Sequence, residues 1–135
     1  MYTPAEEVHR ALLERWRKAM NLVGPGPVEP HFVDAMGAVA GLEAVGRWAD
    51  LGSGAGFPGI ALAARFPSAS VLLVESRAKR ATFLAQVIRE AQLDNASVFH
   101  GRVEDLSTGF DGIISRAFRP PEAYLADAQR LLTPD

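Results

Sequence analysis

Residues 48–60 read WADLGSGAGFPGI, and this stretch decides the fold. A short apolar run, Trp48–Leu51, breaks into alternate glycines at positions 52, 54 and 56 and then resumes with helical spacing. The pattern is typical of a strand, a tight loop and a helix, an arrangement that turns backbone N–H groups and the start of a helix toward a ligand. The stretch therefore predicts a nucleotide-type binding loop in an α/β fold.

The spacing of the glycines indicates the kind of ligand. A dinucleotide-binding fold requires G-x-G-x-x-G, but Phe57 occupies the position of the third glycine of that fingerprint. The G-x-G-x-G pattern, with Asp50 two positions ahead of it, resembles the first motif of S-adenosylmethionine-dependent methyltransferases. In that resemblance Gly52, Gly54 and Gly56 let the backbone approach the cofactor, because glycine adopts a positive φ without steric penalty, and Phe57 forms a wall of the pocket. The alternative is a loop that only closes a βα unit, which three glycines would weaken through added unfolded-state entropy.

Composition bounds the class of protein. The 135 residues are 48% hydrophobic and 22% charged with a net charge of −2, as expected for one domain with a single core. Near-neutral charge argues against a general nucleic-acid binder held by long-range attraction, but leaves room for a local basic patch. There is no cysteine, and the three histidines are too scattered for an evident zinc site. No apolar run approaches the roughly 20 residues needed to cross a bilayer, so we expect a cytoplasmic enzyme without a metal or a membrane partner.

Two helices are predicted ahead of the glycine stretch. The first begins with a capping box at residues 3–6, continues with apolar residues at helical spacing to Val23, and is ended by the Gly-Pro repeat at 24–27. Trp16 lies on its apolar stripe, so we expect this side chain in the core rather than as a base-stacking platform. The second helix is predicted over residues 30–42.

Motifs in these two helices narrow the resemblance to one family. Residues 16–22 read WRKAMNL and residues 31–34 read HFVD. They resemble the W-N-K-x-x-N-L and R-H-x-x-D-S segments of the bacterial 16S ribosomal RNA guanine-N7 methyltransferase G family, also called glucose-inhibited division protein B. Six residues of that pattern are kept, namely Trp16, Lys18, Asn21, Leu22, His31 and Asp34. The sequence departs from it at Arg17, Pro30 and Ala35.

The resemblance implies substrate-side roles for Asn21, His31 and Asp34, with residues 1–45 as the substrate-side helical segment of a single domain. The residues themselves leave alternatives open. Asn21 could simply cap the first helix. His31 and Asp34 could form a surface i, i+3 pair that contributes a few tenths of a kcal/mol, about 0.2–0.5.

The remaining residues, 46–135, alternate strands and helices and are predicted to form the cofactor-binding α/β core. We expect strands over 71–74, 96–100 and 110–118, and helices over 60–66, from residue 76 onward, and over 121–132, with a turn starting at 134. This order is typical of a Rossmann-like class I methyltransferase fold with a mostly parallel sheet in the order 3-2-1-4. Compared with the family, the last strands are lacking, so the fourth strand is predicted to be an open edge through which the protein self-associates or pairs with a partner.

Several side chains near the ends of these strands are candidate cofactor ligands. Glu75 ends the second strand, where one carboxylate can accept hydrogen bonds from both ribose hydroxyls; a solvated strand-end carboxylate is the alternative. The family's R-V-E segment is matched here, so the resemblance gives Val103 and Glu104 the adenine-binding role. Its I-S-R-A segment is also matched, and by that resemblance Arg116 contacts the cofactor.

Three further residues have two interpretations each. Lys79 and Arg80 either meet RNA phosphates or are solvated on a helix surface. Phe118 either forms a base-stacking edge or packs under the last helix.

The function implied by the resemblance is transfer of a methyl group from S-adenosylmethionine to N7 of a guanine in 16S rRNA, which leaves S-adenosylhomocysteine. Small-subunit rRNA or the ribosomal subunit is then the expected partner. The alternatives are a non-catalytic cofactor-binding or interaction module derived from the same family, and a methyltransferase for a small molecule.

Overall fold

A four-stranded parallel sheet lies at the centre of the structure, a computed structural model that describes residues 1–116 and 119–133. Its strands are β1 (Gly46–Leu51), β2 (Ala69–Glu75), β3 (Ala96–His100) and β4 (Gly112–Ile114). They lie in the order β3-β2-β1-β4, and every pairing is parallel. The predicted order 3-2-1-4 is confirmed.

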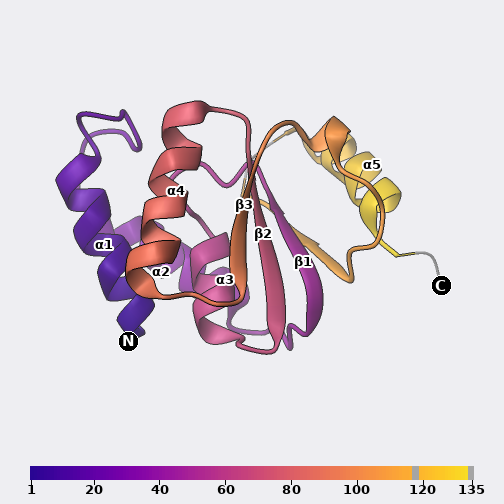
Figure 1. Cartoon of the computed structure of the whole chain (residues 1–135), viewed down its shortest axis with the longest axis horizontal. Helices are drawn as coiled ribbons and strands as arrows, with labels where there is room; N and C mark the ends of the chain where they lie inside the picture. Colours follow the sequence, from indigo (N-terminus) through magenta and orange to yellow (C-terminus); the bar gives the residue numbers. More distant parts are fainter. Residues whose placement is uncertain (117–118, 134–135) are drawn as a thin grey trace.

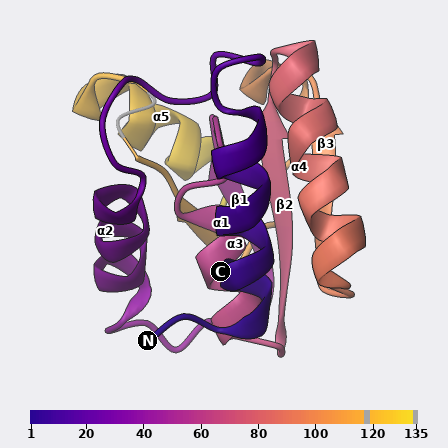
Figure 2. The ribbon, with the colours of Figure 1, turned by 90° about the vertical axis from the view of Figure 1, so that its left-hand side faces the viewer.

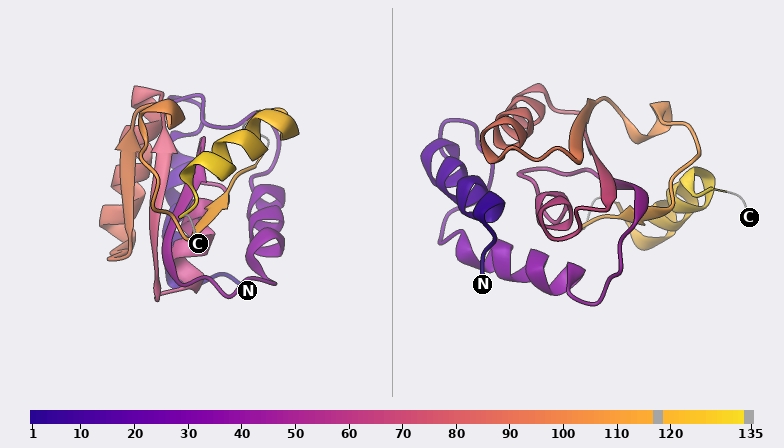
Figure 3. Two further views of the ribbon diagram at one scale, coloured as in Figure 1. Left: turned by 90° about the vertical axis from the view of Figure 1, so that its right-hand side faces the viewer. Right: turned by 60° about the horizontal axis from the view of Figure 1, so that its bottom comes forward.

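Helices cover both faces of this sheet (Figure 1). The helices α3 (Gly59–Arg65) and α4 (Ala78–Ala91) lie on one face, with α1 (Pro4–Trp16) and α2 (Glu29–Val39) packed against them (Figures 2 and 3). The short 3-10 helix η1 (Val103–Asp105) and the helix α5 (Pro121–Leu131) lie on the other face. The arrangement is the doubly wound α/β fold, in which ligands bind beyond the carboxyl ends of the strands.

The strands are continuous apolar runs because each face of the sheet has its own core. Successive side chains of a strand point to opposite faces. On β2, Val71 and Leu73 therefore pack in the core under α1 to α4, whereas Leu72 and Val74 pack in the smaller core with Leu131 of α5.

The first helix begins as predicted but ends earlier. The capping box is present, with the Thr3 hydroxyl accepting from the Glu6 amide and the Glu6 carboxylate accepting from the Thr3 amide. The spacing predicts a helix up to the Gly-Pro repeat, yet α1 ends at Trp16 and residues 17–21 form turns. Asn21 has φ +52° and the next residue, Leu22, is buried, so the apolar spacing continues through a turn that folds back on the core. Asn21 does not cap α1, whose C-cap is Arg17.

The edge of the sheet at β4 also differs from the prediction. The observed strand is three residues long, within the predicted span 110–118, and the end of that span, with Phe118, lies outside the described residues. Phe110 forms an isolated parallel bridge with Leu132, and the Thr133 amide donates to the Phe110 carbonyl at 2.7 Å. The predicted turn from residue 134 also falls outside the described residues. Within the part that is described, no helix has the length and apolar content to cross a bilayer.

Candidate functional site

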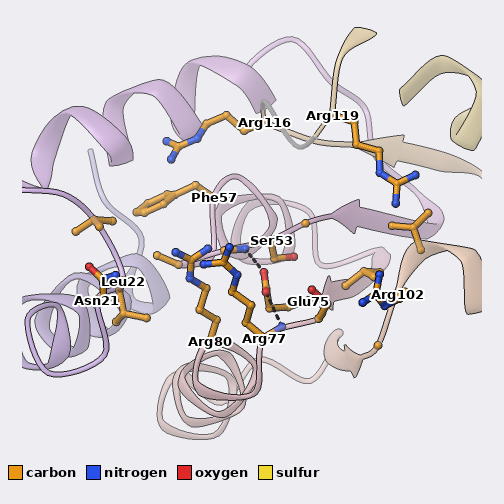
Figure 4. Close-up of a pocket in the computed structure, with 18 of the residues that line it drawn as sticks. Asn21, Leu22, Ser53, Phe57, Glu75, Arg77, Arg80, Arg102, Arg116 and Arg119 are labelled. Atoms are coloured by element: carbon orange, nitrogen blue, oxygen red, sulfur yellow. Dashed lines mark hydrogen bonds between the residues drawn. The ribbon is translucent and has the colours of Figure 1, made fainter. Parts of the chain in front are cut away.

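A pocket of about 620 Å³ opens at the carboxyl end of the sheet (Figure 4). Its walls come from the turn after α1, the start of α2, the glycine loop, the β2–α4 junction, η1 and the segment after β4. The volume is in the range of small-molecule and cofactor sites. The predicted site residues that line it are Asn21, His31, Gly52, Gly54, Phe57, Glu75, Val103, Glu104 and Arg116. Gly56 and Asp34 are outside the lining, and Asp34 is exposed on α2.

Four amides of the glycine loop, those of residues 53, 54, 56 and 57, donate inside the protein, which corrects the expectation that they turn toward a ligand. Those of Ser53, Gly56 and Phe57 donate to backbone carbonyls, and that of Gly54 donates to the Glu75 carboxylate at 2.8 Å. The loop still approaches the pocket closely, because Gly54 lines it with φ +59° and no Cβ. The polar character of the pocket therefore comes mainly from side chains.

The N-terminus of α3 is likewise capped by the protein itself. Asp50, fully buried at the end of β1, accepts a hydrogen bond from the Gly59 amide through Oδ2 at 2.9 Å. A Cβ on Gly59 would lie 2.5 Å from that oxygen, so this position requires glycine. Oδ1 of Asp50 has no hydrogen-bond partner among the described residues, and burial raises the pKa of this carboxyl to about 7.

Glu75 is held in place by two backbone amides. The carboxylate is nearly buried, with one oxygen accepting from Gly54 at 2.8 Å and the other from Arg77 at 2.9 Å. Each oxygen of an ionised carboxylate has about two lone-pair sites, so each can accept a second hydrogen bond. The position at the end of β2, on the pocket wall, suits a pair of adjacent hydroxyls such as those of a ribose.

Phe57 forms a wall of the pocket and carries two polar partners. The His31 ring stacks on it with centroids 5.5 Å apart, and the Arg116 guanidinium carbon lies 5.1 Å from its centroid. Nη1 of Arg116 is 3.3 Å from Nδ1 of His31. Burial, with the charge of Arg116, lowers the pKa of His31, so the neutral ring can accept a hydrogen bond from Arg116.

The opposite side of the pocket is formed by η1. Val103 is buried and offers an apolar contact, whereas Glu104 is exposed and pairs with Arg119 at 2.6 Å. Arg130 of α5 donates to the carbonyls of Val103 and Leu106 at 2.8 and 2.7 Å, which ties η1 to α5. The carboxylate of Glu104 is thus already engaged by an arginine.

The pocket contains a concentration of arginines that the net charge of the chain did not indicate. Arg80 was predicted to be either a phosphate contact or a solvated charge, and it lies in the pocket, whereas Lys79 does not. Two carboxylates, Glu75 and Glu104, face these cations in the described lining. Five arginines contribute: Arg77, Arg80, Arg102, Arg116 and Arg119 (Figure 4). The spacing i, i+3 of Arg77 and Arg80 at a helix start is the signal that could have placed both on one side.

His9 had no predicted role and lies against the glycine loop. His9 belongs to α1, and its ring is buried. Nε2 is 2.7 Å from the carbonyl oxygen of Ala55. A histidine on the apolar stripe of a helix, beside Leu12 and Leu13, is the only signal of this contact in the sequence.

Within residues 1–116 and 119–133, no group of three or more His, Asp or Glu side chains is arranged to hold a metal ion.

The parallel sheet, with its pocket beyond the carboxyl ends of the strands, defines a Rossmann-like α/β domain. Solved structures similar to this chain include TYW2 of M. jannaschii in complex with AdoMet, with TM-score 0.66 and 17% identity over 76% of this chain and 48% of that one. Another is coclaurine N-methyltransferase bound to N-methylheliamine and SAH, with TM-score 0.60 and 15% identity over 96% of this chain and 33% of that one. At these identities the likeness shows the fold.

The chain belongs to the rRNA small subunit methyltransferase G family (GidB), whose family model matches residues 6–135. Relatives named ribosomal RNA small subunit methyltransferase G include one from Pseudomonas paraeruginosa, 40% identical over 89% of this chain and 61% of the relative. Another, from Stutzerimonas stutzeri, is 41% identical over 90% of this chain and 60% of the relative. The chain therefore spans about three-fifths of the length of these relatives.

Proposed function

We propose that the pocket binds S-adenosylmethionine and that the protein transfers the methyl group to N7 of a guanine in 16S rRNA. The observation that carries the proposal is the fixed carboxylate of Glu75 at the end of β2, in a chain of the methyltransferase G family. Family membership supports small-subunit rRNA as the acceptor, and the pocket supports the cofactor.

The chemistry of the lining fits an adenosyl group. Glu75 would receive the two ribose hydroxyls, and Val103 would contact the adenine ring through its apolar side chain. Gly52 and Gly54, both with positive φ, leave room for the amino-acid tail, whose carboxylate would find Arg116 or Arg80 within the same pocket. Every one of these residues lines the same continuous hollow.

S-adenosylmethionine, when bound, supplies a methyl group activated by a sulfonium. Guanine N7 has a free lone pair and needs no proton removed, so no side chain has to act as a general base. The protein would contribute by holding the acceptor in line at attack distance, an effect that supplies up to about 7–11 kcal/mol in favourable cases. The His31 ring stacks on Phe57 at the pocket wall, and we assign the orientation of the target base to this pair.

The arginines around the hollow suit an RNA acceptor. Arg77, Arg80 and Arg102 present guanidinium groups at the pocket, although the chain as a whole has a net charge of −2. Contacts to phosphates position a nucleic acid without reading its sequence. The guanine has to be exposed in a loop or an assembly intermediate, because the deep, narrow major groove of A-form RNA hides N7.

Calorimetry with S-adenosylhomocysteine, followed by transfer of labelled methyl groups to small ribosomal subunits, tests the proposal. Gly54→Asp places a carboxylate and a strained backbone in the pocket and should abolish binding, whereas Gly37→Asp, on an open face of α2, should not. Arg116→Ala should reduce transfer at least about tenfold, as expected when a charge-assisted hydrogen bond is lost. Arg89→Ala, an exposed arginine of α4 outside the pocket lining, is its matched control.

The outcomes separate the alternatives. Binding without methyl transfer would favour a cofactor-binding module, and transfer to small molecules in place of ribosomal subunits would favour a different acceptor. Full activity in both pocket variants would show that the reaction occurs elsewhere in the protein.

A further inference from the structure

We propose that His9 is a positioning residue of the cofactor site: from α1 it holds the carbonyl of Ala55 and so keeps the glycine loop and Phe57 in the shape that forms the pocket wall. The contact joins the first helix of the chain to a loop 46 residues later in the sequence. The link to cofactor binding rests on the proposed function, whereas the effect on the loop can be measured without any ligand.

Among the described residues, His9 has one hydrogen-bond partner and is enclosed by aromatic rings. The side chain is 1% exposed, and Nε2 lies 2.7 Å from the Ala55 oxygen. Three phenylalanine rings surround the imidazole, those of Phe32, Phe57 and Phe83, with centroids 4.9, 5.0 and 6.1 Å away. The cage fixes the ring so that Nε2 points to the loop.

The hydrogen bond specifies one protonation state. A carbonyl oxygen can only accept, so Nε2 must carry the proton, and Nδ1 of the neutral ring then carries none. Burial lowers the pKa of His9 to about 4, so the neutral form dominates at physiological pH. An apolar side chain of similar volume would leave the Ala55 carbonyl without this donor.

The loop is shaped to receive His9. A Cβ on Gly56 would lie 2.9 Å from Nε2, so the absence of a side chain at Gly56, which has φ +109°, gives the imidazole its place. The adjacent residue, Phe57, contacts His9 and is also the ring on which His31 stacks in the pocket. Displacing His9 would therefore move a wall of the site and not only the end of a helix.

A second contact of α1 provides the comparison that separates positioning from simple docking. Glu6 pairs with Arg65 of α3 at 2.8 Å, and Arg65 is outside the pocket lining. Breaking that ion pair loosens α1 on the core and leaves the contact of His9 with the loop in place. Arg65→Met is therefore the matched control for His9→Phe.

The experiment compares amide hydrogen exchange at residues 53–57, without ligand, and affinity for S-adenosylhomocysteine. In His9→Phe we expect loop exchange, relative to the α4 amides, to rise about tenfold and affinity to fall about tenfold, as for the loss of one buried hydrogen bond. His9→Gln, whose amide nitrogen can donate from the position of Nε2, should restore both to within about threefold. His9→Leu replaces His9→Phe if the latter does not fold.

The inference is overturned if His9→Phe leaves loop exchange unchanged, or if Arg65→Met raises it equally, because the histidine would then only dock α1. A wild-type protein that does not bind S-adenosylhomocysteine would refute the proposed function, and the exchange comparison would still decide the role of His9. Failure of His9→Gln to restore the loop would also count against the hydrogen bond.

Discussion

Acidification should destabilise this protein because His9 is buried in its neutral form. Replacing His9 by a side chain that does not titrate should remove this pH effect. Burial lowers the pKa of His9 from 6.5 to about 4, so the folded state resists taking up a proton that the unfolded chain accepts readily. A base with a lowered folded pKa contributes stability that is present above its unfolded pKa and is lost as the pH falls toward its folded pKa. The affected window therefore runs from about pH 6.5 down to about pH 4.

The magnitude follows from the two pKa values. Each pKa unit corresponds to about 1.4 kcal/mol, so the full loss is about 3 kcal/mol, of which about 2 kcal/mol is lost between pH 7 and pH 5. The pH dependence that Asp50 gives to the free energy of unfolding has the opposite sign. Burial raises the pKa of Asp50 to about 7, so its contribution to stability is present at low pH and is lost as the pH rises through the interval from 3.8 to about 7. The pH profile of the wild type alone mixes these two effects.

Urea unfolding of the wild type and of His9→Gln at pH 7, 6 and 5 isolates the histidine. Glutamine does not titrate, so the free energy of unfolding of the wild type should fall relative to the variant by about 2 kcal/mol between pH 7 and pH 5. Asp50→Asn, measured in the same way, should remove the opposing slope. Parallel profiles for the wild type and His9→Gln would refute the claim that a neutral, buried imidazole holds the loop.

Three further expectations follow from other contacts. Glu75→Gln should weaken binding of S-adenosylhomocysteine about 10- to 100-fold by calorimetry. The reason is that a neutral amide replaces a carboxylate whose two oxygens both accept hydrogen bonds. Unchanged affinity would show that Glu75 is not part of the site. Arg130→Met should lower the free energy of unfolding by about 1 kcal/mol in urea, because the hydrogen bonds from Arg130 to the carbonyls of Val103 and Leu106 are lost, and a stability equal to that of the wild type would contradict this. If the edge at β4 pairs with another chain, sedimentation at micromolar concentration should show species larger than a monomer, whereas a strictly monomeric protein would contradict the prediction.

The strands themselves could be predicted because their signals are local, whereas their order came from the resemblance to the methyltransferase fold. The glycine stretch specifies a strand, a loop and a helix on its own, and the apolar runs that follow require a sheet covered on both faces. Right-handed crossovers then leave few topologies. The place of Glu75 in the pocket lining could be predicted for the same reason, since a polar residue at the end of a buried strand is visible in the sequence; its role toward a ribose stays a prediction.

The details that failed depend on contacts between distant segments. Apolar spacing could not show that α1 ends at Trp16, because Leu22 is buried through a turn rather than through a helix. The loop amides were predicted to face a ligand, but four of them donate to Glu75 or to nearby carbonyls. Asp34 lies exposed on α2 outside the pocket lining, so its substrate-side role stays a prediction.

The arginine cluster and the role of His9 were hidden for a related reason. The five arginines come from separate segments, and only the fold brings them to one hollow. The net charge of a chain sums all its acidic and basic residues, so it does not reveal a local cluster of arginines. A histidine within an apolar stripe reads as part of the core, and only the position of Ala55 shows which loop it supports.

The way in which α1 is attached to the core affects how the chain folds during its synthesis on the ribosome. This helix is synthesised before its anchors, because Ala55 and Arg65 follow His9 and Glu6 by 46 and 59 residues. At about 5–20 residues per second, the nascent helix has to wait about 2–12 s for them. During that interval the apolar stripe of α1 has no native packing partner, which makes it a binding site for chaperones that act on nascent chains.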